Sequence, residues 1–172
     1  MTRVFVGVGS NINPADNVRR AICLLGRKVR ILGISTFYLT EALGRPHDLP
    51  FYNGVVAVEI DLPPTALKES ALRRIEQEMG RRWTEDKYAP RVIDLDILFY
   101  EGQADSVDSE IGMRPFLAIP LYELSPDLML PGLGAIKDIA GALSNNDMKP
   151  LSEFTEQLRI DIERHIDEQA EG

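Results

Sequence analysis

The sequence predicts a single α+β domain, residues 1–172, in which helices pack on an antiparallel β-sheet. Its 172 residues are enough for one domain with a well-buried core. Four apolar-rich stretches are typical of strands, and in the fourth of them apolar and polar residues alternate; several segments between and after them repeat apolar residues with the period of a helix. The order of these elements, βαββαβ followed by additions, is the pattern of a ferredoxin-like α/β/α sandwich with a C-terminal helical extension.

Residues 1–60 contain three predicted strands and one helix. The strands are the apolar-rich stretches 4–9, 29–39 and 51–60. Asn13 is expected to cap a helix that has Pro14 at its first position, because asparagine suits a helix N-cap and proline suits the first turn. Gly26 can end this helix, and residues 40–50, with their glycine and prolines, predict a loop.

The rest of the chain adds further helices and the fourth strand. Pro64 begins a second helix, and the charged residues 80–89 after it lack an apolar period and predict a loop. Residues 116–124 are apolar and predict either a strand or a short helix. The remaining predicted helices are residues 136–143 and the amphipathic residues 151–172.

The fourth strand, residues 89–99, is the most informative stretch of the chain. Its apolar residues alternate with polar ones and are expected to share one face: Ile93, Leu95, Ile97 and Phe99. Asp94 and Asp96 then project from the other face, with Cβ atoms about 7 Å apart. A strand this apolar is expected to be central in the sheet, where two like charges are costly unless a cation lies between them.

These two carboxylates therefore indicate a divalent-metal site. Mg²⁺ prefers oxygen ligands and keeps room for water and phosphate. The planar guanidinium of Arg91, beside the pair, can hold phosphate oxygens. The alternative is that Asp94 and Asp96 are only the solvated face of an exposed strand. The phosphate-binding motifs of P-loop and Rossmann proteins do not occur in the sequence.

Charge and composition narrow the function classes. The net charge of −8 argues against general binding to nucleic acids or anionic membranes, which require a basic surface. One basic group stands out: Arg81, Arg82, Lys87 and Arg91. Cys23 is the only cysteine, which excludes a disulfide within the chain. The N-terminal residues lack a signal-peptide pattern and no apolar run has membrane-span length, so we expect a cytoplasmic protein, monomeric or a weak homo-oligomer.

Five short motifs follow one another along the chain. They are Gly9-Ser10-Asn11, Phe51-Tyr52-Asn53, Glu76-x-x-x-Gly80-Arg81, Pro90-Arg91-x-Ile93-Asp94-Leu95-Asp96 and Arg114-x-Phe116. In this order, over residues 4–131, the chain resembles the 6-hydroxymethyl-7,8-dihydropterin pyrophosphokinase family. The Arg-x-x-Asp-x-Asp segment and the Glu-x-x-x-Gly-Arg segment before it are the most specific parts of the resemblance.

The resemblance implies an enzyme of folate biosynthesis that transfers pyrophosphate from ATP to the hydroxymethyl oxygen of the pterin and releases AMP. It implies that two Mg²⁺ ions bridge Asp94 and Asp96 to the ATP phosphates. The residues implied in ATP binding are Glu76, Arg81, Arg82, Arg91 and Arg114, with Arg81 and Arg91 also active in catalysis. The alternatives are that Arg81 is a cation at a helix C-terminus and that Glu76 is a solvated helix glutamate.

The resemblance also implies a pterin site. Phe51 and Phe116 match the aromatic residues that sandwich the flat pterin ring. Asn53 matches the residue that reads its amide edge, since an amide side chain carries a donor and an acceptor. Thr40 and Leu43 match residues whose backbone lines the same site. From residue type alone, the two phenylalanines are more typical of a buried core.

Three features depart from the family pattern. Trp83 stands where the family usually has a second loop arginine, a role that Arg82 could take over. Tyr88 stands where tryptophan is frequent. Residues 101–110 are shorter and more acidic than the corresponding family segment and lack its histidine, which puts contacts with ATP in doubt unless the acidic side chains point away.

Three functional hypotheses follow from these observations. An active pyrophosphokinase is favoured by the presence of both aspartates and of the implied pterin residues. A phosphoryl- or nucleotidyl-transferase with another acceptor, or a non-catalytic pterin- or nucleotide-binding protein, would be consistent with Trp83 and the acidic segment. An RNA-binding module of the same topology is disfavoured by the acidic charge. In the first hypothesis, loops 40–50 and 80–89 are expected to close over ATP.

Overall fold

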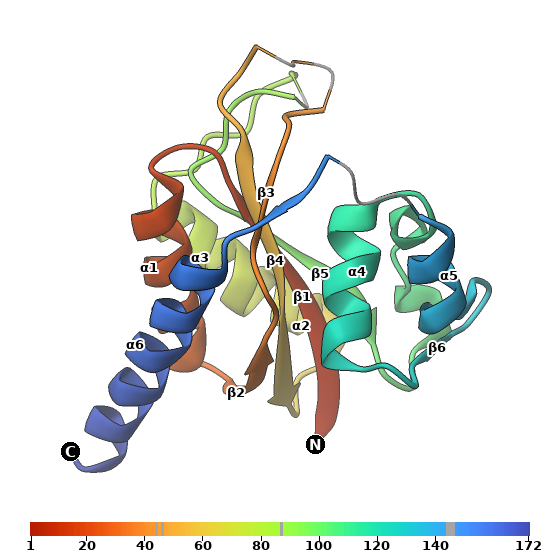
Figure 1. Ribbon diagram of the computed structural model, residues 1–172. Coiled ribbons are helices and arrows are strands. Elements are labelled where there is room, and N and C mark those ends of the chain that lie inside the picture. Colours follow the sequence, from red (N-terminus) through yellow and green to blue (C-terminus); the bar gives the residue numbers. More distant parts are fainter. Residues whose placement is uncertain (44, 46, 87, 144–146) are drawn as a thin grey trace.

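An antiparallel β-sheet forms the middle layer of the protein (Figure 1). The computed structural model describes residues 1–43, 45, 47–86, 88–143 and 147–172. Within these residues the main sheet has the strand order β5-β1-β4-β3-β8, and β2 pairs with β4 beside β3. Its strands are β1 (Thr2–Ser10), β2 (Arg30–Ile34), β3 (Tyr38–Thr40), β4 (Phe51–Ile60), β5 (Asp94–Tyr100) and β8 (Lys149–Pro150). Two short strands, β6 (Met129–Leu130) and β7 (Gly134–Ala135), form a separate sheet.

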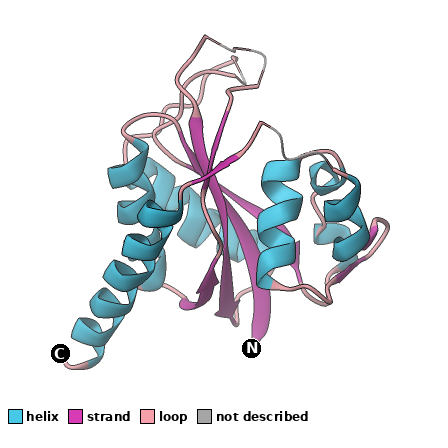
Figure 2. Ribbon diagram, viewed as in Figure 1, coloured by secondary structure: helices cyan, strands magenta, loops and turns pink. Residues whose placement is uncertain are grey.

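Helices cover both faces of the sheet and give the molecule three layers (Figures 1 and 2). One face carries α1 (Pro14–Gly26), α6 (Ser152–Ala170) and a continuous helix made of α2 (Pro64–Leu67), the π-helical turn η1 (Lys68–Leu72) and α3 (Arg73–Glu78). The other face carries α4 (Pro115–Leu124) and α5 (Ile136–Ala142). Two 3₁₀ turns, η2 (Ala104–Ser106) and η3 (Ser109–Gly112), lead from β5 to α4. The predicted antiparallel α/β/α arrangement is confirmed.

The alternation of β1 divides the interior into two cores. Val4, Val6 and Val8 face one way and pack with apolar residues of α1, α2, α3 and α6. Phe5 faces the other way and packs with residues of α4 and α5. Each such side chain contributes about 1.5–3 kcal/mol when it is fully buried, so the alternation of this one strand holds both helical layers to the sheet.

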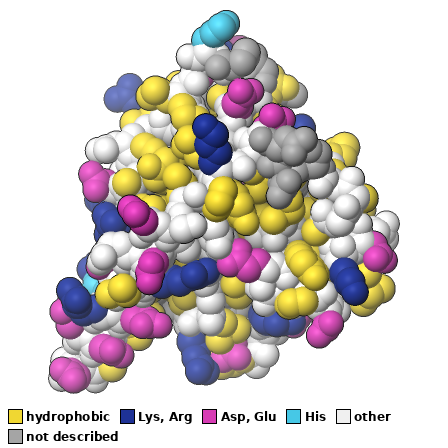
Figure 3. Space-filling view, in the orientation of Figure 1, with side chains coloured by type: hydrophobic (Ala, Val, Ile, Leu, Met, Phe, Trp, Pro, Cys, Tyr) yellow, Lys and Arg dark blue, Asp and Glu magenta, His cyan; other side chains and the backbone are white. Residues whose placement is uncertain are grey.

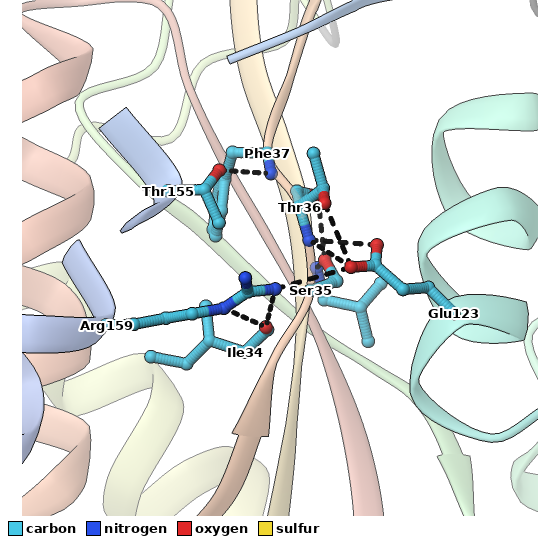
Figure 4. Close-up of polar contacts among 8 residues, drawn as sticks. Ile34, Ser35, Thr36, Phe37, Glu123, Thr155 and Arg159 are labelled. Carbon is cyan, nitrogen blue, oxygen red and sulfur yellow. Dashed lines mark hydrogen bonds and ion pairs between the residues drawn. The ribbon is translucent and has the colours of Figure 1, made fainter. Parts of the chain in front are cut away.

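The single strand predicted over residues 29–39 is two strands, β2 and β3, because residues 35–37 leave the regular ladder (Figure 4). Side chains of α6 bind the backbone groups on either side of the break. Arg159 donates to the carbonyl oxygen of Ile34, at 2.9 Å from Nε and 2.7 Å from Nη2. The hydroxyl of Thr155 accepts from the backbone N–H of Phe37 at 2.9 Å.

Helix α4 contributes a further partner to the same break. The backbone N–H of Thr36 donates to the carboxylate of Glu123, at 2.9 Å to Oε2, and Glu123 also accepts from Arg159 at 3.3 Å. Ser35 keeps its contact with β4 by donating from its N–H to Val55 and accepting the Val55 N–H on its hydroxyl. The interruption is therefore saturated with hydrogen bonds, which an apolar pattern in the sequence cannot indicate.

Strand β5 differs from its prediction in two respects. It is an edge strand that pairs with β1 alone among the described strands, whereas its apolar sequence predicted a central position. Its pairing with β1 also shifts between Phe5 and Val6, which makes Leu98 an extra residue on β5. Because of this bulge, Phe99 lies in the core on the α4 side and not with Leu95, as strict alternation predicted.

Other elements differ from their predictions in smaller ways. Residues 116–124, left open between strand and helix, form α4, with Pro115 in its first turn. Asn13 precedes α1 in a left-handed conformation (φ 43°) and its side chain does not cap the helix. The outer end of α6 extends past the sheet and carries side chains of both charges (Figure 3). Among the described residues, no helix combines the length and apolar character that a membrane span requires.

Candidate active site

A cavity of about 280 Å³ lies on the α4 side of the sheet, where β1 ends and β4 and β5 begin. Three neighbouring strands contribute its floor: Gly7 and Gly9 from β1, Phe51 and Asn53 from β4, and Asp94 and Asp96 from β5. Its rim is formed by the loops after β3 and before β5 and by the segment that leads into α4. Because antiparallel strands bring opposite chain ends to one edge of a sheet, residues distant in sequence meet here.

Asp94 is enclosed by two arginine side chains. Arg81 Nη1 lies 2.8 Å from Asp94 Oδ1, and Arg91 Nη1 lies 2.6 Å from Asp94 Oδ2. The Asp94 side chain is 18% exposed. Arg91 is three residues before Asp94, and Arg81 comes from the end of the helix that packs beside β5, so the two guanidinium groups approach from different elements.

Asp96 lines the same cavity and has a different partner. Lys68 Nζ lies 3.2 Å from Asp96 Oδ1, and the Asp96 side chain is 48% exposed. The protein around the cavity walls withdraws solvent from this carboxylate, and this desolvation, together with the negative charge of Asp94, raises the pKa of Asp96 above its ordinary value. The nearby charge of Lys68 opposes the shift. The site therefore disfavours two uncompensated negative charges, as expected for a position that can receive a cation.

Arg81 links Asp94 to a buried glutamate. Its guanidinium forms an ion pair with Glu76, which is 3% exposed, in addition to the contact with Asp94. Its backbone N–H also donates to the Glu76 carbonyl at 2.9 Å, where the helix ends. The ring of Trp83 lies under the same guanidinium, 4.9 Å from Cζ to the ring centroid, and Arg73 approaches this ring at 5.7 Å. Trp83 thus holds Arg81 by a cation–π contact.

The Gly9-Ser10-Asn11 motif fixes the backbone that carries Arg91. Asn11 Oδ1 accepts from the Arg91 N–H at 2.8 Å, and the Asn11 N–H donates to the Arg91 carbonyl at 3.2 Å. The hydroxyl of Ser10 donates to the Val92 carbonyl at 2.6 Å. Asn11 Nδ2 also donates to the Leu49 carbonyl at 3.2 Å, so one buried side chain connects Arg91 to the loop after β3.

Asn53 lines the same cavity, as do Phe51, Leu43 and Phe116. Its Nδ2 donates to the hydroxyl of buried Thr40 at 2.8 Å, which orients the amide. A Cβ atom at Gly9 would lie 2.6 Å from Asn53 Oδ1, so this strand position accommodates only glycine while Asn53 keeps its place. The result is a slot with aromatic residues and one oriented amide, next to the two carboxylates.

Comparison with known proteins identifies the family. Residues 5–126 match the sequence model of the family described as 7,8-dihydro-6-hydroxymethylpterin-pyrophosphokinase (HPPK). The chain belongs to this family. It is 36% identical over 143 residues to the 2-amino-4-hydroxy-6-hydroxymethyldihydropteridine pyrophosphokinase of Pseudomonas aeruginosa, covering 75% of this chain and 84% of that one. The Haemophilus influenzae protein of the same name is 31% identical over 166 residues, covering 88% and 99%.

Solved HPPK-containing structures share the fold. The wild-type Plasmodium falciparum HPPK-DHPS in complex with pteroate superposes with a TM-score of 0.65 at 14% sequence identity, over 95% of this chain. This chain spans 45% of that chain's length. At this level of identity the likeness establishes the architecture, and the residues of the site have to be considered one by one.

The structure brings most of the predicted site residues to the cavity. Those that line it are Leu43, Phe51, Asn53, Arg91, Asp94, Asp96, Arg114 and Phe116. Arg81 and Glu76 lie behind Asp94 and reach the cavity through it, and Thr40 lies behind Asn53. Arg82 is exposed and outside the cavity lining. Lys87, the fourth member of the basic group, lies outside the described residues.

Sequence reasoning missed several residues of the site. Lys68 escaped notice because helical spacing does not show which lysine reaches a neighbouring strand. Lys68 reaches the site through its ion pair with Asp96, whereas Glu41, Asp108 and Glu110 line the cavity itself. The last two belong to the acidic segment that departs from the family pattern, and this segment is ordered as two 3₁₀ turns, with the Asp108 side chain accepting from the Glu110 N–H. Two acidic residues of this segment, Asp108 and Glu110, therefore line the cavity, whereas Glu101 pairs with Arg3. They add negative charge to the wall of a site that is expected to receive phosphates.

The residues present fit a divalent cation shared with phosphate. Among the described residues, no group of three or more histidine, cysteine or acidic side chains could hold a metal unaided. Two carboxylates on one strand face do suffice for Mg²⁺, which commonly takes its other ligands from water and substrate phosphates. Arg91 and Arg114 line the same cavity and are suited to phosphate oxygens.

Proposed function

We propose that this protein transfers a pyrophosphoryl group from ATP to the hydroxyl of 6-hydroxymethyl-7,8-dihydropterin, as the names of its relatives indicate for them. In this reaction the hydroxyl oxygen bonds to the β-phosphorus of ATP. The bond from that phosphorus to the oxygen bridging it to the α-phosphate breaks, AMP leaves, and the hydroxyl proton passes to solvent. The product is the pterin diphosphate ester, an intermediate of folate biosynthesis.

One observation carries this proposal: a single cavity joins an aromatic slot to a pair of carboxylates and two arginines. Phe51 and Phe116 would stack on the two faces of the pterin ring, and the oriented amide of Asn53 would read its edge. The backbone at Thr40 and Leu43 would complete this slot. A hydroxymethyl group held there would point to Asp94 and Asp96, where the phosphates of ATP are expected.

Asp94 and Asp96 would hold two Mg²⁺ ions together with the ATP phosphates. Bound there, the ions would neutralise phosphate charge and align the attacking and leaving oxygens. Arg91 and Arg114 would contact phosphate oxygens from the cavity wall. Arg81, once released from Asp94, would do the same with Glu76 as its anchor, and Arg82 would contribute only if the loop before β5 moves, since it now lies outside the lining.

We further propose that residues 1–172 act as a single catalytic domain, located in the cytoplasm and either monomeric or weakly self-associating. Neither nucleic acid nor membrane is needed for this function, and the net charge of −8 disfavours both as partners. Pterin and ATP are then the only small-molecule partners that the cavity has to accommodate.

A second candidate is the same chemistry on a different acceptor. The observation behind it is the acidic wall of Asp108 and Glu110, which replaces a family segment that contains histidine. A third candidate, a protein that binds pterin or nucleotide without catalysis, gives no reason for both aspartates to line the cavity beside an arginine.

The test is an assay of AMP release from ATP and Mg²⁺, with and without 6-hydroxymethyl-7,8-dihydropterin. Release of AMP that depends on the pterin supports the proposed function. Pterin binding by fluorescence without AMP release would favour the binding protein. AMP release that appears with another pterin or a purine, and not with this pterin, would favour the altered acceptor.

A further inference from the structure

Lys68 places a positive charge against the second carboxylate of the site. Its Nζ lies 3.2 Å from Asp96 Oδ1. Lys68 is the first residue of η1, the π-helical turn that interrupts the helix running beside β5. A π-turn adds a residue to one turn of a helix and so changes the direction of the side chains around it, and such turns recur at functional sites. The contact is thus made by a residue at a local irregularity of the helix, next to the candidate metal ligands.

The two carboxylates of the site are held in different ways. Asp94 is bound by two guanidinium groups and is largely enclosed. Asp96 pairs with a flexible ammonium group, and 43% of the Lys68 side chain is exposed. An exposed lysine–carboxylate pair contributes little to stability, and the lysine stem has several rotatable bonds. A cation from solution can therefore displace the Lys68 ammonium group from Asp96 more easily than it can displace the two arginines from Asp94.

We propose that Lys68 is a resident counter-ion that competes with the divalent metal ion for Asp96. The inference rests on the proposed function, in which Asp94 and Asp96 hold the metal. A metal ion that binds Asp96 must either displace the ammonium group or accept a positive charge close to it, and both lower its affinity. The protein without nucleotide then binds divalent ions more weakly than its two carboxylates alone would.

This competition has a consequence for the order of binding. The phosphates of ATP bring negative charge to the site and offset the charge of Lys68. A divalent ion therefore binds well only together with ATP, and in the absence of ATP the charge of Lys68 compensates that of Asp96. Lys68 acts here as a positioning residue, because it controls when Asp96 becomes available to the metal and takes no part in bond making.

The test is a titration of the nucleotide-free, full-length protein with Mn²⁺, followed by EPR, in wild type and in Lys68→Met. We expect Lys68→Met to bind Mn²⁺ about three- to tenfold more tightly, because a unit charge near the ion is removed. Lys68→Arg, which keeps the charge, should remain close to wild type. Arg74→Met is the matched control, since Arg74 is an exposed residue of the same helix outside the cavity lining, and its loss should leave the affinity unchanged.

Thermal unfolding gives a second readout without turnover. The melting temperature of Lys68→Met should rise more on addition of Mn²⁺ than that of wild type at the same concentration, because tighter binding to the folded state stabilises it more. A structural salt bridge alone would lower the melting temperature of the variant equally with and without Mn²⁺.

Three results would contradict this inference or its basis. Equal or weaker Mn²⁺ affinity in Lys68→Met overturns the role of Lys68, as does an equal gain in Arg74→Met, which would reveal only a net-charge effect. Asp96→Asn distinguishes a failure of the role of Lys68 from a failure of the metal-ligand assignment. If that variant loses Mn²⁺ binding while Lys68→Met matches wild type, the inference alone fails. If Asp96→Asn binds Mn²⁺ as wild type does, the assignment of the metal ligands in the proposed function fails.

Discussion

Two polar networks of this protein use similar residues in different ways. The network at the break between β2 and β3 contains Arg159, Glu123 and Thr155, whose side chains bind backbone groups of residues 34–37 (Figure 4). The network in the cavity contains arginine, lysine and carboxylate side chains that bind one another, centred on Asp94 and Asp96.

The two networks differ in whether a bound ligand could take the place of one of their side chains. A buried backbone N–H or carbonyl that loses its side-chain partner is left unpaired, which costs free energy. The first network therefore favours one conformation of the chain. The cations and carboxylates of the second network can exchange partners for a metal ion or phosphate without leaving a backbone group unpaired. The first network therefore stabilises the fold, and the second is arranged for binding.

The largest expected effect is the loss of transfer in Asp96→Ala. We expect kcat/KM for pterin-dependent AMP release to fall at least about 100-fold, because a ligand of the metal is removed. The fold should persist, since the Asp96 side chain is 48% exposed. Circular dichroism and the melting temperature check the fold, and retained activity in a folded variant would contradict the two-metal arrangement.

The matched change in the other network is Thr155→Val. This substitution keeps the shape of a buried side chain and leaves the N–H of Phe37 without its acceptor. We expect the free energy of unfolding, measured by urea denaturation, to fall by about 1–3 kcal/mol. The kcat/KM of the folded enzyme should be unchanged. A loss of activity without a loss of stability would show that this network also serves the site.

A smaller effect is expected from Trp83. Trp83→Leu removes the ring under the Arg81 guanidinium, and we expect KM for ATP to rise about two- to fivefold, as for the loss of an exposed cation–π contact. Trp83→Phe should retain most of the wild-type value. Because Trp83 is the only tryptophan, its fluorescence reports directly on this loop. Fluorescence that does not change with saturating MgATP would argue against a role of the loop in binding ATP.

The smallest effect is a pH dependence of stability in the metal-free protein. A carboxyl whose pKa is raised by folding stabilises the protein below its unfolded pKa, and this contribution is lost as the pH rises through the folded value. For Asp96 the loss should begin above its ordinary value of 3.8. Asp96→Asn, in EDTA, should therefore gain in melting temperature relative to wild type between that pH and about pH 7. If the gain in melting temperature of Asp96→Asn over wild type shrinks as the pH rises over this range, the charge of Lys68 has a larger effect on the pKa of Asp96 than desolvation has.

The sequence predicted the fold and the chemical centre better than the details around them. Asp94 and Asp96 were placed together by strand alternation, which is a local property of the backbone. The edge position of β5 and the bulge at Leu98 depend on pairing with β1, which no local pattern contains. The break at residues 35–37 depends on helices α4 and α6, more than 80 residues further along the chain.

The same distinction applies to the site. The motif resemblance was needed to predict Phe51, Asn53 and Phe116 as site residues, since aromatic residues alone are more typical of a core. Lys68 is in contact with Asp96 through the packing of its helix beside β5, and Asp108 and Glu110 reach the cavity through the course of the segment before α4. Contacts between elements decide these positions, and only the folded structure supplies them.

The central claim, that the cavity directs attack at the β-phosphorus of ATP, is tested most directly by identifying the products of the reaction. ³¹P NMR of a reaction mixture of the protein, MgATP and 6-hydroxymethyl-7,8-dihydropterin distinguishes the two sites of attack. The account predicts AMP and a pterin diphosphate ester in equal amounts. ADP and a pterin monophosphate, or a spectrum of unreacted ATP, would contradict it.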